Sequence, residues 1–227
     1  MKVELLQHSS LAICATAIRT CWQSFDKSDN GGPADCALID RVGNKFKHAS
    51  TLEHLTYTFY ISGISRALLQ ELARHRMASP SVKSTRYTLK ELKDEISFTD
   101  GMSMIELKEK YQNPAEVYAD KHMLRASKYL VWSGVLGVDF ASVVALENLR
   151  LMLLDGVSND RAKYCLPESY KTELTWTINA RSLQNFIALR SSKSALWEIQ
   201  DLAKTIFEVL PQEHKYLFEN CVHEEEH

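Results

Sequence analysis

The middle of the chain carries a dense group of side chains that can bind an anion. Residues 74–86 read RHRMASPSVKSTR, with three arginines, a lysine, a histidine and several hydroxyls. Arginine presents a planar fork that matches phosphate oxygens, and serine and threonine hydroxyls supply further donors. Neither GxGxxG nor GxxxxGK followed by Ser or Thr occurs, so side chains and loop amides would have to hold a phosphate. These residue types are equally compatible with a solvated basic loop paired with nearby carboxylates.

A second group lies at residues 179–190, NARSLQNFIALR, where a predicted strand turns directly into a predicted helix. Such turns are common places for ligand-facing side chains. At helical spacing Arg181 and Asn185 share one face, whereas Arg190 falls in line with the apolar residues of the opposite face. An arginine on a buried face requires an anionic or polar partner. A structural carboxylate or a bound anionic substrate could be that partner; the alternative is that Arg190 reaches solvent at the end of the helix.

A third group, His48, Glu53 and His54, lies just before the first strong strand pattern. The spacing is not HExxH and no further ligands follow, so a pair of structural histidines is favoured over a metal site. The five cysteines include no C-x-x-C pair. The sequence therefore predicts no metal centre.

The elements that must position these groups are both strands and helices. Alternating apolar residues predict strands over residues 55–61 and 174–178. Helical spacing predicts helices over residues 65–74 and 182–189, one before the basic segment and one after the second strand. Pro80 excludes a regular helix through the basic segment itself.

The rest of the pattern sets the fold class. Gly and Pro are scarce, 8 and 5 of 227 residues, which favours long helices over an all-β fold with many turns. Two long helices, broken near residues 137–139, are predicted over 113–157. No internal repeat or linker is apparent. The sequence predicts an α/β (α+β), helix-rich single domain with a small central sheet over residues 1–227.

Composition argues against several classes of partner. The formal net charge is −2, so no global basic field points to nucleic acid. The most apolar region, 129–146, is interrupted by polar residues, so no membrane span is expected. The first ten residues, MKVELLQHSS, lack the apolar core of a signal peptide. Unpaired cysteines are typical of reduced thiols, and a cytoplasmic protein is predicted.

The two anion-binding groups together resemble the flavin-dependent thymidylate synthases. The string Arg74-His75-Arg76-Met-Ala-Ser79-x4-Ser84-x-Arg86-Tyr87 looks like that family's signature. At the expected distance it is followed by Leu166-Pro167 and then by WTINARSLQNFIALR. Order and spacing agree from about His48 to Gln200, which is most of the chain.

The resemblance implies reductive methylation of dUMP to dTMP. Methylenetetrahydrofolate would supply the carbon, FAD would carry the hydride and NADPH would reduce the flavin, in a homotetramer whose active sites are shared between subunits. Arg190 would be catalytic, favouring loss of the uracil N3 proton by stabilising negative charge. Ser84 would position the substrate and not act as a nucleophile, because no base stands beside it in the sequence.

The resemblance also assigns binding residues to each ligand. Those carried over for the flavin are Ser50, Arg74, His75, Arg76, Val82, Asn179, Ala180, Arg181 and Asn185. Those carried over for dUMP are Glu71, Arg74, Lys83, Ser84, Thr85, Arg86, Lys163 and Arg190.

Three positions depart from the family pattern. Glu71 stands where the family usually has Gln, Val82 where it often has an acid, and Lys163 where it commonly has Arg.

Two rival functions use the same basic segment. A non-catalytic nucleotide- or RNA-binding protein would bind varied phosphates with steep salt dependence. A nucleotide phosphohydrolase would need clustered acidic metal ligands, which the sequence lacks near this segment.

Overall fold

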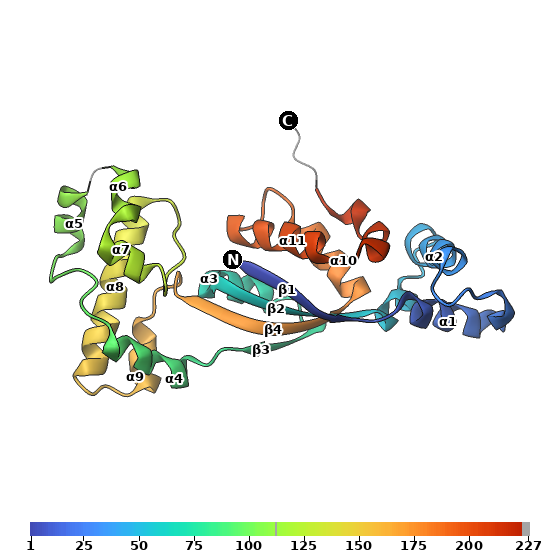
Figure 1. Cartoon of the computed structure of the whole chain (residues 1–227), viewed down its shortest axis with the longest axis horizontal. Coiled ribbons are helices and arrows are strands. Elements are labelled where there is room, and N and C mark those ends of the chain that lie inside the picture. The colour runs from blue at the N-terminus through green and yellow to red at the C-terminus, as the bar shows by residue number, and fades with distance from the viewer. Residues whose placement is uncertain (112, 224–227) are drawn as a thin grey trace. The chain divides into compact units, whose positions relative to one another are not determined.

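The computed structural model describes residues 1–111 and 113–223 and shows a helix-rich chain with one small sheet (Figure 1). The sheet has four strands in the order β1-β2-β4-β3. The strands are β1 (Lys2–His8), β2 (Thr56–Ser65), β3 (Ala78–Val82) and β4 (Lys171–Asn179). The predicted fold class, α/β (α+β) with more helix than strand, is confirmed.

Helices make up most of the remaining structure. The α-helices are α1 (Leu11–Trp22), α2 (Pro33–Ile39), α3 (Arg66–Leu72), α4 (Thr85–Thr88), α5 (Met104–Lys110), α6 (Pro114–Ala119), α7 (Lys121–Ala126), α8 (Leu136–Leu154), α9 (Asn159–Ala162), α10 (Ala180–Arg190) and α11 (Trp197–Val209). Short 3₁₀ or π turns join them: η1 (Phe25–Lys27), η2 (Asp40–Lys45), η3 (Ala49–His54), η4 (Leu89–Asp94), η5 (Lys163–Cys165), η6 (Gln212–Leu217) and η7 (Glu219–Cys221).

The described residues cluster into two compact units. Unit 1 holds residues 1–62, 70–81 and the chain from Leu174 onwards, and unit 2 holds 63–69 and 82–173. Neither unit is one contiguous stretch of chain. The single domain predicted over 1–227 includes residue 112 and residues 224–227, which lie outside the described part, and it stays a prediction.

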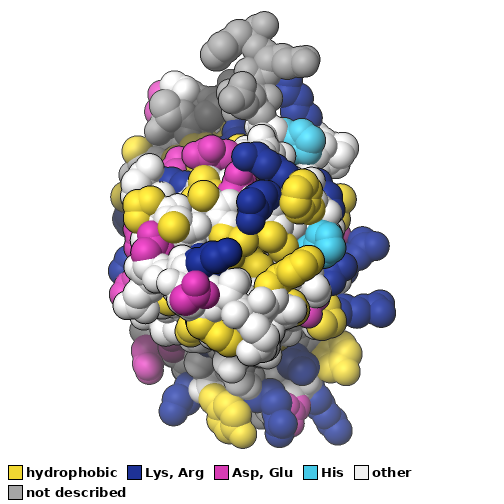
Figure 2. Space-filling view, turned by 90° about the vertical axis from the view of Figure 1, so that its right-hand side faces the viewer, with side chains coloured by type: hydrophobic (Ala, Val, Ile, Leu, Met, Phe, Trp, Pro, Cys, Tyr) yellow, Lys and Arg dark blue, Asp and Glu magenta, His cyan; other side chains and the backbone are white. Residues whose placement is uncertain are grey.

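In unit 1 the predicted strands are confirmed by their burial. Apolar side chains alternate inward along β2 and β4, and Trp176 lies against both Phe59 and Phe186, with ring centroids 6.4 and 5.1 Å away. Phe186 belongs to α10, so α10 packs on the sheet through its apolar face. Figure 1 shows α10 and α11 on one side of the strands. On the face of the molecule shown in Figure 2, apolar side chains are interspersed with both signs of charge.

The basic segment runs along the edge of the sheet. β3 contains Pro80, and the strand order places β3 outermost beside β4. A proline has no N–H to donate to a ladder, and an edge strand tolerates that loss. The sequence excluded a helix here without predicting the strand.

In unit 2 the prediction of two long helices over 113–157 is wrong in its first half. The short helices α6 and α7 come first, and the single long helix α8 begins at Leu136. The predicted break near 137–139 is instead the first turn of α8. There the Asp139 carboxylate accepts hydrogen bonds from the Ser133 amide and hydroxyl, both at 2.8 Å. An acid in the first turn also suits the helix dipole.

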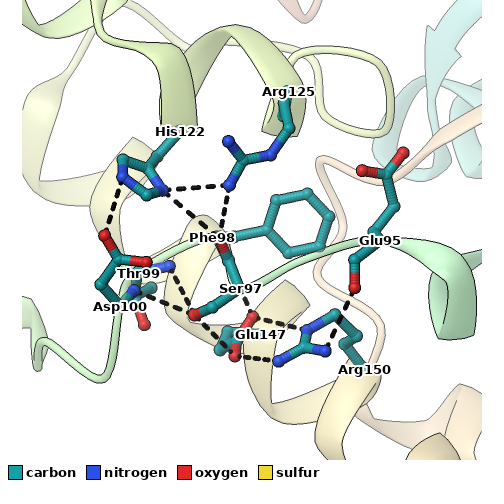
Figure 3. A network of polar contacts seen from close by, with 9 residues as sticks. All are labelled: Glu95, Ser97, Phe98, Thr99, Asp100, His122, Arg125, Glu147 and Arg150. Carbon is teal, nitrogen blue, oxygen red and sulfur yellow. Dashed lines mark hydrogen bonds and ion pairs between the residues drawn. The ribbon is translucent and has the colours of Figure 1, made fainter.

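A buried polar network fixes the chain that follows η4 to α8 (Figure 3). The Glu147 carboxylate accepts from Arg150 Nε at 3.0 Å and Nη2 at 2.7 Å, from the Phe98 amide at 2.9 Å and from Ser97 at 3.0 Å. Arg150 Nη1 donates to the Glu95 carbonyl at 3.2 Å. Burial alone would raise the pKa of Glu147, but the bonds from Arg150, Phe98 and Ser97 bring it below its usual value. The segment after η4 is therefore held to α8 by the buried Glu147–Arg150 ion pair, whose remaining hydrogen-bonding groups contact that segment.

Two negative findings concern the described residues as a whole. None of their helices is long and apolar enough to cross a membrane. They also contain no group of three or more His, Cys, Asp and Glu side chains that could hold a metal ion.

Candidate functional site

The two anion-binding groups of the sequence meet in unit 1 at a cavity of about 860 Å³. Its walls come from η3, from the chain after α3, from the end of β4, from the first turns and the end of α10, and from the loop after α10. The lining residues are Glu53, Arg74, His75, Arg76, Met77, Asn179, Arg181, Ser182, Asn185, Leu189, Arg190, Ser194 and Ala195. Segments about a hundred residues apart in sequence thus share one site.

The turn from β4 into α10 aims the second group at this cavity. The Asn179 side chain caps α10 by accepting from the Ser182 amide at 2.9 Å. Arg181 and Asn185 both line the cavity, as their helical spacing predicts. Arg181 is half-exposed and forms an ion pair with Glu53 at 2.7 Å between Nη1 and Oε1. The Arg181 guanidinium therefore lies at the cavity wall, in a solvent-exposed ion pair with Glu53.

Arg190 points inward, and its partner is a structural carboxylate. Its side chain is 11% exposed, and Nη1 donates to Glu71 Oε2 at 2.8 Å. Nη2 donates to the Glu71 carbonyl at 3.2 Å, and Nε donates to His75 Nε2 at 2.9 Å. The interpretation in which Arg190 escapes to solvent is wrong for this structure. Two of its five N–H donors are left over after these three bonds.

His75 is held in its neutral form beside Arg190. Its Nε2 accepts from Arg190, so the remaining ring proton sits on Nδ1. Burial, and next the positive charge of Arg190, lowers the pKa of His75 to about 4. The ring packs edge-on against Phe186 with centroids 4.9 Å apart. Apolar packing and an arginine donor together fix the orientation of this histidine.

A smaller cavity, of about 340 Å³, lies within unit 2. Its lining residues are Arg66, Thr85, Lys163, Tyr164, Leu166 and Glu168. Thr85 and Lys163 are residues that the family resemblance assigns to dUMP. Arg66, at the start of α3, adds a cation that the sequence reasoning missed, because it lies outside the signature string.

The other cations of the basic segment in unit 2 are paired with carboxylates. Arg86 Nε lies 2.7 Å from Asp160 Oδ1, and both side chains are exposed. Lys83 Nζ lies 3.6 Å from Glu173 and 4.0 Å from Glu91. Arg86 and Lys83 are thus paired with carboxylates, as the solvated-loop interpretation predicts.

Several assigned residues line neither cavity. They are Ser50 in η3, Glu71 in α3, Val82 at the end of β3, Ala180 at the start of α10, and Lys83, Ser84 and Arg86 around α4. Ala180 is buried, so only its backbone is available to a ligand. Their assigned roles stay predictions.

Four further residues line the first cavity without having been predicted as site residues: Met77, Leu189, Ser194 and Ala195. Met77 and Leu189 lie within the two motif strings, and Ser194 and Ala195 lie beyond them. Glu53 was noted as a neighbour of two histidines, but in the structure it pairs with Arg181. Its position just before a strand was the one signal in the sequence that Glu53 could belong to a site. Its pairing with Arg181, 128 residues away, could not be predicted from spacing.

Comparisons with known proteins agree on one family. A model of the family described as thymidylate synthase complementing protein matches residues 4–214. The chain is 65% identical to a flavin-dependent thymidylate synthase of Wolinella succinogenes over 225 residues, which cover 99% of this chain and 100% of the relative. It is 63% identical to one from Campylobacter jejuni, with 99% of both chains covered. The crystal structure of the Helicobacter pylori enzyme complexed with FAD and dUMP matches with a TM-score of 0.87 at 52% identity, covering 98% of this chain and 100% of that one.

Proposed function

This chain belongs to the flavin-dependent thymidylate synthases, and from that premise we propose that it converts dUMP to dTMP by reductive methylation. Methylenetetrahydrofolate is the proposed carbon donor, FAD the hydride carrier and NADPH the reductant. The observation that carries the proposal is the single cavity at which the RHR segment and the NARSL helix meet. The five cysteines are free thiols, which fits the proposed cytoplasmic location.

The residues of the unit 1 cavity fit FAD. Arg74 and Arg181 offer exposed cationic forks for its two phosphates, and Asn179 and Asn185 offer amide groups at the same wall. The neutral ring of His75 lies beside these groups. When bound, FAD supplies the hydride that reduces the transferred one-carbon unit. The chain's own task is to hold the cofactor and exclude competing water.

The proposed dUMP ligands come from the basic segment and its neighbours. Ser84, Thr85 and Arg86 would hold the nucleotide, and Lys163 would add a cation to its phosphate. The Arg86 guanidinium is exposed, and an exposed ion pair contributes only about 0–1 kcal/mol, so a phosphate can replace Asp160 at small cost. We propose a homotetramer with shared active sites. Exposed apolar side chains such as Leu154 and Tyr164 fit burial between subunits.

Arg190 is the proposed catalytic residue. His75 and Glu71 hold its guanidinium in place at the cavity wall, and two of its N–H donors remain for a ligand. Loss of the N3 proton leaves negative charge on the uracil ring and its oxygens, and a fixed guanidinium stabilises that charge. The ring carbon that receives the one-carbon unit then becomes more nucleophilic.

A flavin titration followed by a product assay tests the proposal. We expect the purified chain to retain FAD after excess is removed, and we expect dUMP to perturb the flavin absorption band. dTMP should then appear only when dUMP, methylenetetrahydrofolate and NADPH are all present. Failure to retain FAD, with binding of varied phosphates that weakens steeply with salt, would instead support the non-catalytic nucleotide-binding hypothesis.

A further inference from the structure

The Glu71 carboxylate contacts the proposed catalytic arginine from outside the cavity. Arg74, His75 and Arg190 line the cavity, whereas Glu71, also a described residue, does not. From this arrangement we infer that Glu71 is a positioning residue that moderates the charge of Arg190 and so sets the pH at which a uracil bound beside Arg190 loses its N3 proton. The inference rests on the proposed function and deepens it.

Glu71 holds Arg190 with two different acceptors. Its carboxylate accepts from Nη1 at 2.8 Å and its carbonyl from Nη2 at 3.2 Å. The second carboxylate oxygen lies 3.8 Å from Arg74 Nη1, an ion pair in which Arg74 is mostly exposed. Of the two arginines, Arg190 therefore lies closer to the Glu71 carboxylate and is the less exposed.

The charged and titratable groups around this end of α10 come from α3 and the chain after it, from α10 itself, from η3, and from the chain after η7, where His223 Nε2 lies 2.9 Å from the Ala188 carbonyl. Glu71 and His75 stand at and just after the end of α3 and contact Arg190 directly. Arg181 precedes it on α10, and Glu53 of η3 pairs with Arg181. His75 is neutral over the neutral pH range, because burial and Arg190 lower its pKa to about 4. Among the described residues, Glu71 is thus the carboxylate in direct contact with Arg190.

A carboxylate in contact with a guanidinium cancels part of its field. Seen from the cavity, Arg190 paired with Glu71 stabilises an ionised uracil less than a lone arginine would. The Glu71 side chain is 32% exposed, so solvent screens its charge. One charge acting over several ångströms in such surroundings changes a neighbouring pKa by about one unit. Neutralising Glu71 should lower the pKa of the bound uracil N3 by about that amount.

The test compares wild type with Glu71→Gln in the FAD-loaded protein. Gln keeps the shape and an acceptor oxygen for Arg190 but removes the charge. The probe is 5-fluoro-dUMP, whose ¹⁹F resonance changes when N3 ionises, titrated with pH in the bound state. Glu71→Asp keeps the charge and serves as the rescue variant. Glu4→Gln removes an exposed carboxylate that lines neither cavity and serves as the control.

We expect the bound probe to lose its N3 proton about one pH unit lower in Glu71→Gln than in wild type. Glu71→Asp and Glu4→Gln should both titrate as wild type does. An unchanged or raised pKa in Glu71→Gln overturns the inference, as does an equal shift in Glu4→Gln. If Glu71→Gln fails to fold, a normal titration in Glu71→Lys overturns the inference, since a reversed charge must lower the pKa further. Wild type that takes up FAD but not the probe would refute the proposed function itself.

Discussion

Replacing Glu147 by Gln should destabilise unit 2 because it leaves a buried arginine without its counter-charge. Both side chains are buried, with Glu147 6% and Arg150 8% exposed. Removing one partner of a buried pair costs about 3–5 kcal/mol, since the other charge remains desolvated. Gln keeps one acceptor oxygen, but its NH₂ group faces donors from Arg150, Phe98 or Ser97. We therefore expect a loss of about 3 kcal/mol, at the lower end of that range.

Amide hydrogen exchange localises this loss better than a global melt, because two units need not unfold together. Faster exchange is expected in residues 95–100 and in α8. The effect has a pH signature. The folded-state pKa of Glu147 is lowered, so its contribution is present above the unfolded-state value and is lost as the pH falls through the folded-state value. Wild type and variant should therefore converge in acid.

A matched substitution on the surface provides the control. Glu4 pairs with Lys2 at 3.4 Å, and both side chains are exposed. Glu4→Gln removes the same charge and should cost no more than about 0.5 kcal/mol. If Glu147→Gln changes exchange in α8 as little as Glu4→Gln does, the argument from buried charge is refuted. The argument is also refuted if the difference in exchange rate between Glu147→Gln and wild type persists unchanged at low pH.

Three further predictions concern the site. Protonation of His75 removes the acceptor for Arg190, so the contribution of its neutral form is present above the usual histidine pKa and is lost as the pH falls through about 4. dUMP binding measured against pH should show a loss there, separate from the step, at about pH 6, at which the phosphate of dUMP itself takes up a proton. Asn179→Ala removes the cap of α10 and should cost about 1 kcal/mol in chemical denaturation, with weaker flavin retention. Ser84→Ala should weaken dUMP binding or slow turnover while FAD is still retained; complete loss of activity at unchanged dUMP affinity would contradict its positioning role.

The sequence was most informative where local periodicity decides the structure. Alternation along β2 and β4 and helical spacing in α10 were enough to place Arg181 and Asn185 on one face and Arg190 on the other. It failed where one specific side-chain contact decides. The start of α8 depends on Asp139 accepting from Ser133, which makes a glycine-containing turn the beginning of a helix and not a break. Local propensity cannot show such a contact.

The site shows the same division. An inward arginine could be predicted from spacing, but its partner could not, because Glu71 reaches Arg190 only when the end of α3 lies against the end of α10. Pro80 likewise excluded a helix, while its acceptance in β3 depends on which strand lies at the edge of the sheet. The sequence thus identifies candidate site residues, whereas the packing of helices and strands determines which partner each of them contacts.

Burial separates the ion pairs that a ligand can displace from those that persist. Arg181 and Glu53 are 54% and 48% exposed, so their pair contributes about 0–1 kcal/mol, and an incoming phosphate can take the place of Glu53. Arg190 is 11% exposed and keeps His75 and the Glu71 carbonyl as further acceptors, so displacing the carboxylate would strip a partly buried charge of its counter-ion. A ligand should therefore exchange with Glu53 while Glu71 stays in place. The cavity then keeps a negative charge beside its innermost arginine throughout turnover, which is why the charge of Glu71 should be measurable in the ionisation of a bound base.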